Sequence, residues 1–317
     1  MSRLRSEVFE WLDAGRVEPG REGEALRAAG VIPTPVDWRT FLGQLSLWLG
    51  TVALAASVIF FFAFNWDDLG RFAKFGLVEA AICAGLLVCC WTDLDGMGGK
   101  AILLLLSLLV GALLALAGQV YQTGADTFEL FGWWAVLILP WVLIARFSPL
   151  WLLWLVLLNL AASFYFSLFS DGEELAWVLF AVNGLALAAW EAGRRLGLSW
   201  LRDSWTPRLV ALASAGTATA LISWAILDAE NGRGVLAAVA YLAWLGGLYA
   251  WYRHARPDLF MLAAGLLSLI VTVAVFLSRQ MLGSDDGASF LLIGLVVIGM
   301  AAGGAVWLKS VAREQPA

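Results

Sequence analysis

Residues 100–121, KAILLLLSLLVGALLALAGQVY, decide the fold class of this chain. After Lys100 the stretch holds no charged residue, and a helix of this length crosses the roughly 30 Å hydrocarbon core of a bilayer. Similar apolar runs recur along the chain, in which 61% of the 317 residues are apolar and 14% are charged. So few polar residues cannot coat a soluble globule. The sequence therefore predicts an all-α polytopic membrane protein.

Ten such runs are expected to be transmembrane helices. A cytoplasmic helical hairpin and linker over residues 1–39 precede them, and a cytoplasmic tail over residues 309–317 follows. The shortest break, at residues 146–149, predicts a tight hairpin, because a single span of about 40 residues would be twice what a bilayer needs. The transmembrane domain, residues 40–308, is predicted to contain spans at 40–64, 72–91, 100–121, 128–146, 148–169, 174–192, 207–227, 234–252, 257–278 and 288–308.

The first 39 residues are predicted to form two short helices. Trp11 and Leu12 belong to an apolar pattern of helical spacing that ends near Gly15, and a second helix is expected within residues 18–30. Two prolines in residues 33–39 predict a stiff connector. Because helices this short cannot bury a core alone, Trp11 and Leu12 are candidates for docking a cytoplasmic protein partner.

The distribution of charge predicts the orientation. With the N-terminus in the cytoplasm, ten Lys and Arg residues fall in inner loops and the tail, and four fall in outer loops, as the positive-inside rule requires. Both termini are therefore expected in the cytoplasm. The charged start of the chain lacks an apolar signal region, so no cleavable signal peptide is expected. A net charge of −5 without a basic cluster argues against nucleic-acid binding.

Cysteine and histidine give no sign of a metal site. Cys83, Cys89 and Cys90 lie within one apolar run, and the only histidine is His254. Their spacing matches no zinc site, so small buried residues are the preferred interpretation, with acylation of Cys89 and Cys90 as the alternative. The sequence also has no P-loop, nucleophile elbow or HExxH helix. We therefore expect no metal, no cofactor and no enzymatic activity.

The 18 tryptophans favour an aromatic belt over a ligand cage. An amphipathic indole is favoured at headgroup depth, and many of these residues lie near predicted span ends. Close to one such end, Glu191 precedes Arg194 and Arg195, which predicts an interfacial ion pair. The tryptophans near span ends are Trp38, Trp66, Trp91, Trp133, Trp190, Trp200, Trp205 and Trp307.

Glu79 is the least expected residue in a predicted span, since it lies seven residues inside the second one. An ionised acid at this depth costs a few kcal/mol and should face protein or water. The predicted topology places further polar side chains toward the outer side or at mid-span. These candidate ligand- or proton-binding residues are Asn65, Asp67, Gln119, Tyr121, Gln122 and Asn159.

Two interpretations of these residues stay open. In the first, Glu79 titrates within an outward-facing polar pocket between the first three spans, which binds or transports a small polar solute or a lipid headgroup. In the second, the polar side chains only hold helices together, and the protein is a non-catalytic scaffold or sensor whose N-terminal hairpin docks a partner. An enzyme acting on lipid-linked substrate is the weakest hypothesis, because the acids are dispersed and no histidine lies beside them.

Several motifs resemble the bacterial membrane family named domain of unknown function 2157. Residues 10–17, EWLDAGRV, are similar to its N-terminal element of helix, Trp, Gly and second helix. The resemblance covers about residues 5–165 and implies a bacterial inner-membrane protein with a cytoplasmic helical pair; it implies no activity. The other motifs that carry it are FNWD at 64–67, LGR at 69–71, GQVYQTGAD at 118–126, WW at 133–134 and LPW at 139–141.

Overall fold

The computed structural model describes residues 3–18, 20–65, 68–122, 124–170, 172–201, 205–228, 234–281 and 287–314. All regular elements in these ranges are helices. Ten of the described helices are long and apolar enough to cross a membrane. The predicted class, an all-α polytopic membrane protein with about ten spans, is confirmed.

The chain divides into two compact units, and the boundary falls inside α5. Unit 1 is Met1–Leu109 and unit 2 is Val110–Gln315. Unit 1 contains α1 (Arg3–Asp13), α2 (Glu22–Ala28), α3 (Pro35–Phe64), α4 (Arg71–Trp91) and the start of α5 (Met97–Tyr121). Unit 2 contains the rest of α5, α6 (Thr127–Ala145), α7 (Ser148–Phe169), α8 (Glu173–Arg195), η1 (Ser199–Leu201), α9 (Trp205–Leu227), α10 (Gly234–Ala250), η3 (Trp251–Ala255), α11 (Leu259–Gln280) and α12 (Gly287–Glu314).

In unit 1, helix α3 begins earlier than the sequence suggested. Thr34 and Asp37 form a capping box, in which the Asp37 N–H donates to Thr34 Oγ1 at 3.3 Å and the Thr34 N–H donates to Asp37 Oδ2 at 2.8 Å. Pro35 occupies the first helical turn, where its missing N–H costs no hydrogen bond. The expected stiff connector through residue 39 is therefore wrong beyond Thr34, and the transmembrane helix starts there instead.

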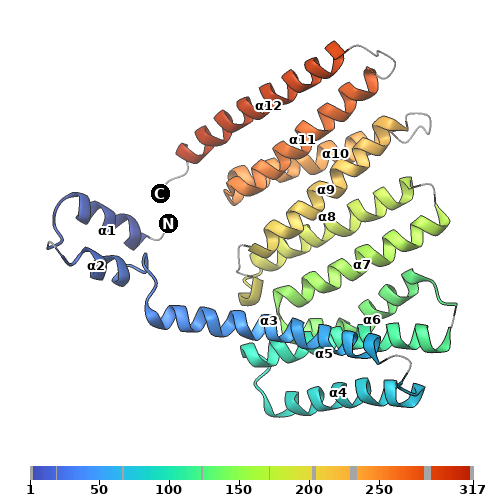
Figure 1. The fold of residues 1–317 in the computed structure, drawn as a ribbon. Coiled ribbons are helices and arrows are strands. Elements are labelled where there is room, and N and C mark those ends of the chain that lie inside the picture. Colours follow the sequence, from blue (N-terminus) through green and yellow to red (C-terminus); the bar gives the residue numbers. More distant parts are fainter. Residues whose placement is uncertain are drawn as a thin grey trace. The chain divides into compact units, whose positions relative to one another are not determined.

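Unit 2 is a row of helices in which neighbours along the chain pack side by side. Helix α9 packs against α8, α10 and α11, and α12 packs on α11, as Figure 1 shows. The tight hairpin expected at residues 146–149 is present, because Arg146 takes a left-handed conformation (φ 45°) between α6 and α7. Small side chains on α9, including fully buried Ala211, Ser214 and Ala218, allow this close packing.

Buried hydroxyl groups connect three helices in the interior of unit 2. Tyr241 of α10 places its hydroxyl 3.0 Å from Ser268 Oγ of α11, and Ser268 Oγ lies 2.7 Å from Thr219 Oγ1 of α9. Thr272 adds a bond to the Tyr241 hydroxyl at 3.2 Å. Such interhelical bonds are individually modest in membranes, and this network joins α9, α10 and α11.

Candidate functional site

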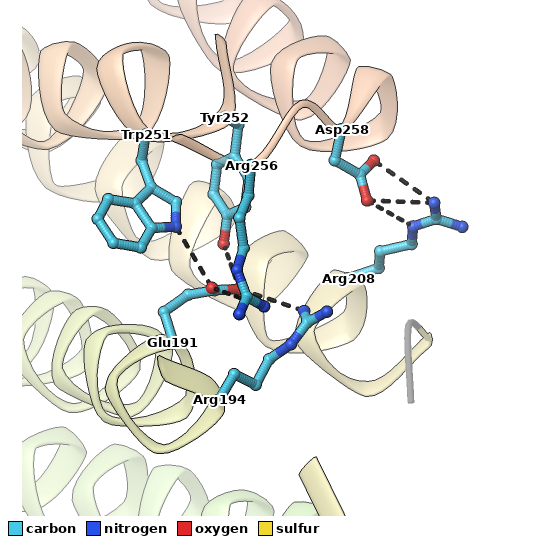
Figure 2. Close-up of polar contacts among 7 residues, drawn as sticks. All are labelled: Glu191, Arg194, Arg208, Trp251, Tyr252, Arg256 and Asp258. Atoms are coloured by element: carbon cyan, nitrogen blue, oxygen red, sulfur yellow. Dashed lines mark hydrogen bonds and ion pairs between the residues drawn. The ribbon is translucent and has the colours of Figure 1, made fainter. Parts of the chain in front are cut away.

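A buried carboxylate with four partners lies where α8 ends and η3 begins (Figure 2). Glu191 is only 6% exposed. Its Oε1 accepts hydrogen bonds from the Tyr252 hydroxyl at 3.0 Å and from Arg194 Nη1 at 3.4 Å. Its Oε2 accepts from Trp251 Nε1 at 3.3 Å and lies 3.9 Å from Arg256 Nη1. Both oxygens are thus satisfied by donors from two distant parts of the chain.

The local geometry of η3 explains how these donors reach one acid. The Arg256 N–H donates to the Trp251 carbonyl at 2.9 Å, an i to i+5 bond of the π type. π segments in helices are rare and occur frequently at functional sites. The wider turn brings two consecutive side chains, Trp251 and Tyr252, onto the same carboxylate.

The cluster carries more positive than negative charge. The predicted pair of Glu191 with Arg194 is confirmed at 3.4 Å. Arg195 makes a different contact, since its guanidinium carbon lies 3.7 Å from the centroid of the Trp251 ring, a cation–π geometry. Three arginines, at 194, 195 and 256, therefore stand against one glutamate, which leaves a surplus of two positive charges.

The neighbouring charges in the described residues are paired among themselves. Arg208 donates to Asp258 through Nε at 3.3 Å and through Nη2 at 3.2 Å, beside the Glu191 cluster in Figure 2. Arg253 of η3 is paired with Glu314 at the end of α12. These neutral pairs do not cancel the positive surplus around Glu191.

An apolar cavity of about 400 Å³ runs between α8 and α10 toward this cluster. Its α8 wall extends from Gly184 to Glu191 and Arg195, a rise of about 16 Å along a helix. Glycine and alanine on both walls, including Gly247 on α10, leave the space open. The result is an apolar slot with a cationic end.

Two of the predicted site residues, Glu79 and Asn65, lie in unit 1. Glu79 is exposed on α4, and no hydrogen bond or ion pair reaches it within the described ranges. Lys74 on the same helix is buried. Asn65 ends α3 and donates through Nδ2 to the Phe61 carbonyl at 2.8 Å. Asp67 lies outside the described residues.

The remaining polar candidates belong to unit 2. Gln119, Tyr121 and Gln122 are exposed at the end of α5. A pocket that they share with Glu79 stays a prediction, because Glu79 belongs to the other unit. Asn159 and Asn183 donate to each other's side-chain oxygens, at 3.3 and 2.6 Å, and so join α7 to α8. This exchange matches the interpretation of Asn159 as interhelical glue, although both residues also border a cavity of about 450 Å³.

The partner-docking candidates lie on α1. Trp11 is 45% exposed and Leu12 is half-buried, whereas Val8 is buried. Docking of a partner by these residues stays a prediction.

Sequence reasoning missed Trp251, Tyr252 and Arg256 as partners of Glu191. They lie about 60 residues further along the chain, and no local spacing links them to it. The available signal was an acid among several arginines at one predicted membrane boundary. The belt interpretation is also wrong for Trp190, which is only 8% exposed because it packs inside unit 2.

The apolar helices and their packing define a polytopic helical membrane protein. Residues 9–151 match the family model described as Predicted membrane protein (DUF2157). The resemblance seen in the sequence motifs is thereby confirmed over that range. No curated protein and no solved structure matches the chain.

Proposed function

We propose that this protein binds an anionic membrane lipid between α8 and α10, with the headgroup at the arginines around Glu191. On this proposal it resides in a bacterial inner membrane with both termini in the cytoplasm, which places the arginine cluster at the cytoplasmic boundary. Basic pockets between transmembrane helices on that side are a known form of headgroup recognition. The sequence analysis also considered a lipid headgroup as the ligand, in a pocket between the first three spans. The present proposal places the headgroup between α8 and α10 instead.

The observation that carries the proposal is the position of Arg195 at the end of the apolar cavity. Arg195 is exposed, and among the described residues no carboxylate lies within ion-pair distance of it. Its guanidinium is held over Trp251, which orients it without neutralising it. Guanidinium groups bind phosphate with two parallel hydrogen bonds, and the cavity offers the apolar surface that an acyl chain requires.

The headgroup contact is tested with the full chain in nanodiscs of phosphatidylethanolamine to which phosphatidylglycerol is added. Bound lipid is counted by native mass spectrometry. We expect wild type to retain phosphatidylglycerol and Arg195→Gln to bind it at least fivefold more weakly. Arg313→Gln is the matched control, since Arg313 is an exposed arginine on α12 that does not border the cavity. Equal retention by the two variants would contradict the proposal.

Substitutions at two adjacent glycines of α10 test whether the acyl chain of the lipid occupies the cavity. A Cβ at Gly246 or Gly247 meets no atom within 4 Å, so both positions have room for a side chain. Of these two glycines, Gly247 is among the described residues that line the cavity and Gly246 is not. We expect Gly247→Leu to fill the cavity and abolish lipid retention, while Gly246→Leu binds as wild type. Unchanged retention in Gly247→Leu would show that the lipid lies elsewhere.

Partner docking by the N-terminal hairpin is a second candidate function. Phe9 and Trp11 on α1 are 42% and 45% exposed, and exposed aromatic side chains are enriched at protein interfaces. A photo-crosslinking amino acid at Trp11 should yield one discrete protein adduct in cells, and the same group at Gly23 on α2 should not. Equal labelling at both positions would argue for non-specific contact.

A further inference from the structure

The carboxylate at the cationic end of the slot between α8 and α10 is already occupied by donors of the protein (Figure 2). Glu191, which lines this end, accepts hydrogen bonds at Oε1 from the Tyr252 hydroxyl and from Arg194. Its Oε2 accepts from Trp251 Nε1 and lies 3.9 Å from Arg256 Nη1. Each oxygen thus has two partners, which is close to the full capacity of a carboxylate. A hydroxyl or ammonium donor of a lipid headgroup therefore finds no free carboxylate oxygen in the described lining of the slot.

The backbone carbonyls around this end also accept hydrogen bonds from the chain itself. At the end of α8, the carbonyls of Ala192, Gly193 and Arg194 accept backbone N–H groups of the turn that follows, at 3.0 to 3.3 Å. In η3, the carbonyls of Trp251 and Tyr252 accept backbone N–H groups at 2.9 and 3.2 Å. A headgroup with donors of its own has to compete with these bonds, and such a headgroup is therefore disfavoured at this end.

Arg195 supplies the donors that a ligand can use. It lines the slot and is exposed, and its guanidinium carbon lies 3.7 Å from the centroid of the Trp251 ring. No carboxylate of the described residues lies within ion-pair distance of it. A guanidinium donates through several N–H groups and accepts nothing. The group held at Arg195 must therefore present acceptor oxygens and negative charge.

The positive charge around this end exceeds what one monoanionic headgroup neutralises. Arg194 and Arg256 are not among the described residues that border the slot, but charges act over several ångströms, so both add to the positive potential at Arg195. Together the three arginines exceed Glu191 by two charges. A phosphomonoester carries about −1.5 to −2 charges at pH 7 and three strong acceptor oxygens, and its dianion has no donor. A terminal phosphate therefore matches the donors of Arg195 and the surplus charge better than a phosphodiester does.

We infer that the lipid in the slot is a phosphomonoester, an apolar chain that ends in a terminal phosphate held by Arg195. The inference rests on the proposed lipid site and narrows the ligand of that site. Lipids with a phosphodiester headgroup bind there more weakly, because they bring a single negative charge and, in phosphatidylglycerol, hydroxyl donors for which the described lining has no free carboxylate oxygen. Two membrane constituents share the terminal phosphate: diacylglycerol phosphate and polyprenyl phosphate.

Three phospholipids with identical acyl chains test the headgroup. The full chain is placed in phosphatidylcholine nanodiscs at about pH 8, above the second pKa of a phosphomonoester, with equal amounts of phosphatidic acid, phosphatidylmethanol and phosphatidylglycerol. Phosphatidylmethanol has one charge and no hydroxyl donor, so it separates the effect of charge from that of donors. Bound lipid is counted by native mass spectrometry. We expect phosphatidic acid to be retained at least about fivefold more than either diester.

Two arginine variants show whether this preference arises in the slot. Arg195→Gln should reduce the preference for phosphatidic acid to below about twofold, because the remaining charges do not contact the phosphate. Arg313→Gln on α12 is the matched control and should keep the preference of wild type. Both arginines are exposed, so neither substitution disturbs the packing of the helices.

Farnesyl phosphate then separates the two sources of a terminal phosphate. Displacement of phosphatidic acid by an equal amount of farnesyl phosphate assigns the slot to a polyprenyl phosphate, and its retention assigns the slot to diacylglycerol phosphate. If wild type retains phosphatidic acid and either diester equally, while Arg195→Gln loses all of them, the phosphomonoester inference is overturned and the lipid site stands. No difference between wild type and Arg195→Gln for any lipid overturns both.

Discussion

Two glutamates in apolar helices, Glu191 in α8 and Glu79 in α4, have opposite surroundings. Glu191 is buried and its two oxygens meet four donors from α8 and η3. Glu79 is exposed on its helix, and no partner reaches it within the described ranges. The position of a glutamate within an apolar run therefore does not decide whether its carboxylate is buried and paired. The partners supplied by distant helices decide it, and the following predictions test this contrast.

The largest effect is expected from removing the Glu191 carboxylate. Glu191→Ala leaves Arg194 and Arg256 without their counter-charge and orphans the Tyr252 hydroxyl. Breaking a buried ion pair from one side typically costs about 3–5 kcal/mol. Because the Arg194 and Arg256 side chains are partly exposed, solvent screens the charges left behind, and we expect a loss at the lower end of this range, about 3 kcal/mol, in the free energy of unfolding, measured by SDS-induced unfolding in mixed micelles. A loss below about 1 kcal/mol would mean that the network contributes little to the fold.

Removing the Tyr252 hydroxyl alone should lower the free energy of unfolding by a smaller amount. Tyr252 is 3% exposed and donates to Glu191 Oε1 at 3.0 Å. A hydrogen bond to a charged group is worth about 1.5–3 kcal/mol, so Tyr252→Phe should lower the unfolding free energy by roughly that amount. In the Glu191→Ala background the same change should have almost no effect. Additive losses in the double variant would show that the two residues act independently.

The amide pair of α7 and α8 should contribute less than the charged cluster. Asn159 and Asn183 exchange side-chain hydrogen bonds, and each Nδ2 also donates to a carbonyl of its own helix. Interhelical hydrogen bonds in membranes average about 0.6 kcal/mol. A double-mutant cycle with Asn159→Leu and Asn183→Leu should give a coupling energy near that average. A coupling energy above about 2 kcal/mol would contradict the role of modest glue.

The sequence predicted the helices far better than it predicted their contacts. Each span is encoded locally, by an uninterrupted apolar run such as residues 100–121, so its position follows from hydropathy alone. The contact of Glu191 with Tyr252 joins residues 61 positions apart. Such a contact depends on which helices pack together, and that packing has no local signature. The burial of Trp190 was missed for the same reason, since a tryptophan near a span end favours the boundary until a neighbouring helix covers it.

The smallest effect on stability is expected at Glu79. Because Glu79 is exposed and no partner within the described ranges reaches it, Glu79→Gln should change the unfolding free energy by less than about 0.5 kcal/mol, as surface substitutions usually do. The sequence hypothesis gives Glu79 a use outside the fold, in ligand or proton binding. Mass spectrometry of molecules that co-purify with wild type and with Glu79→Gln measures that use directly. A species lost only in the variant would support the predicted outward-facing polar pocket, while identical spectra together with a large stability loss would make Glu79 a structural residue like Glu191.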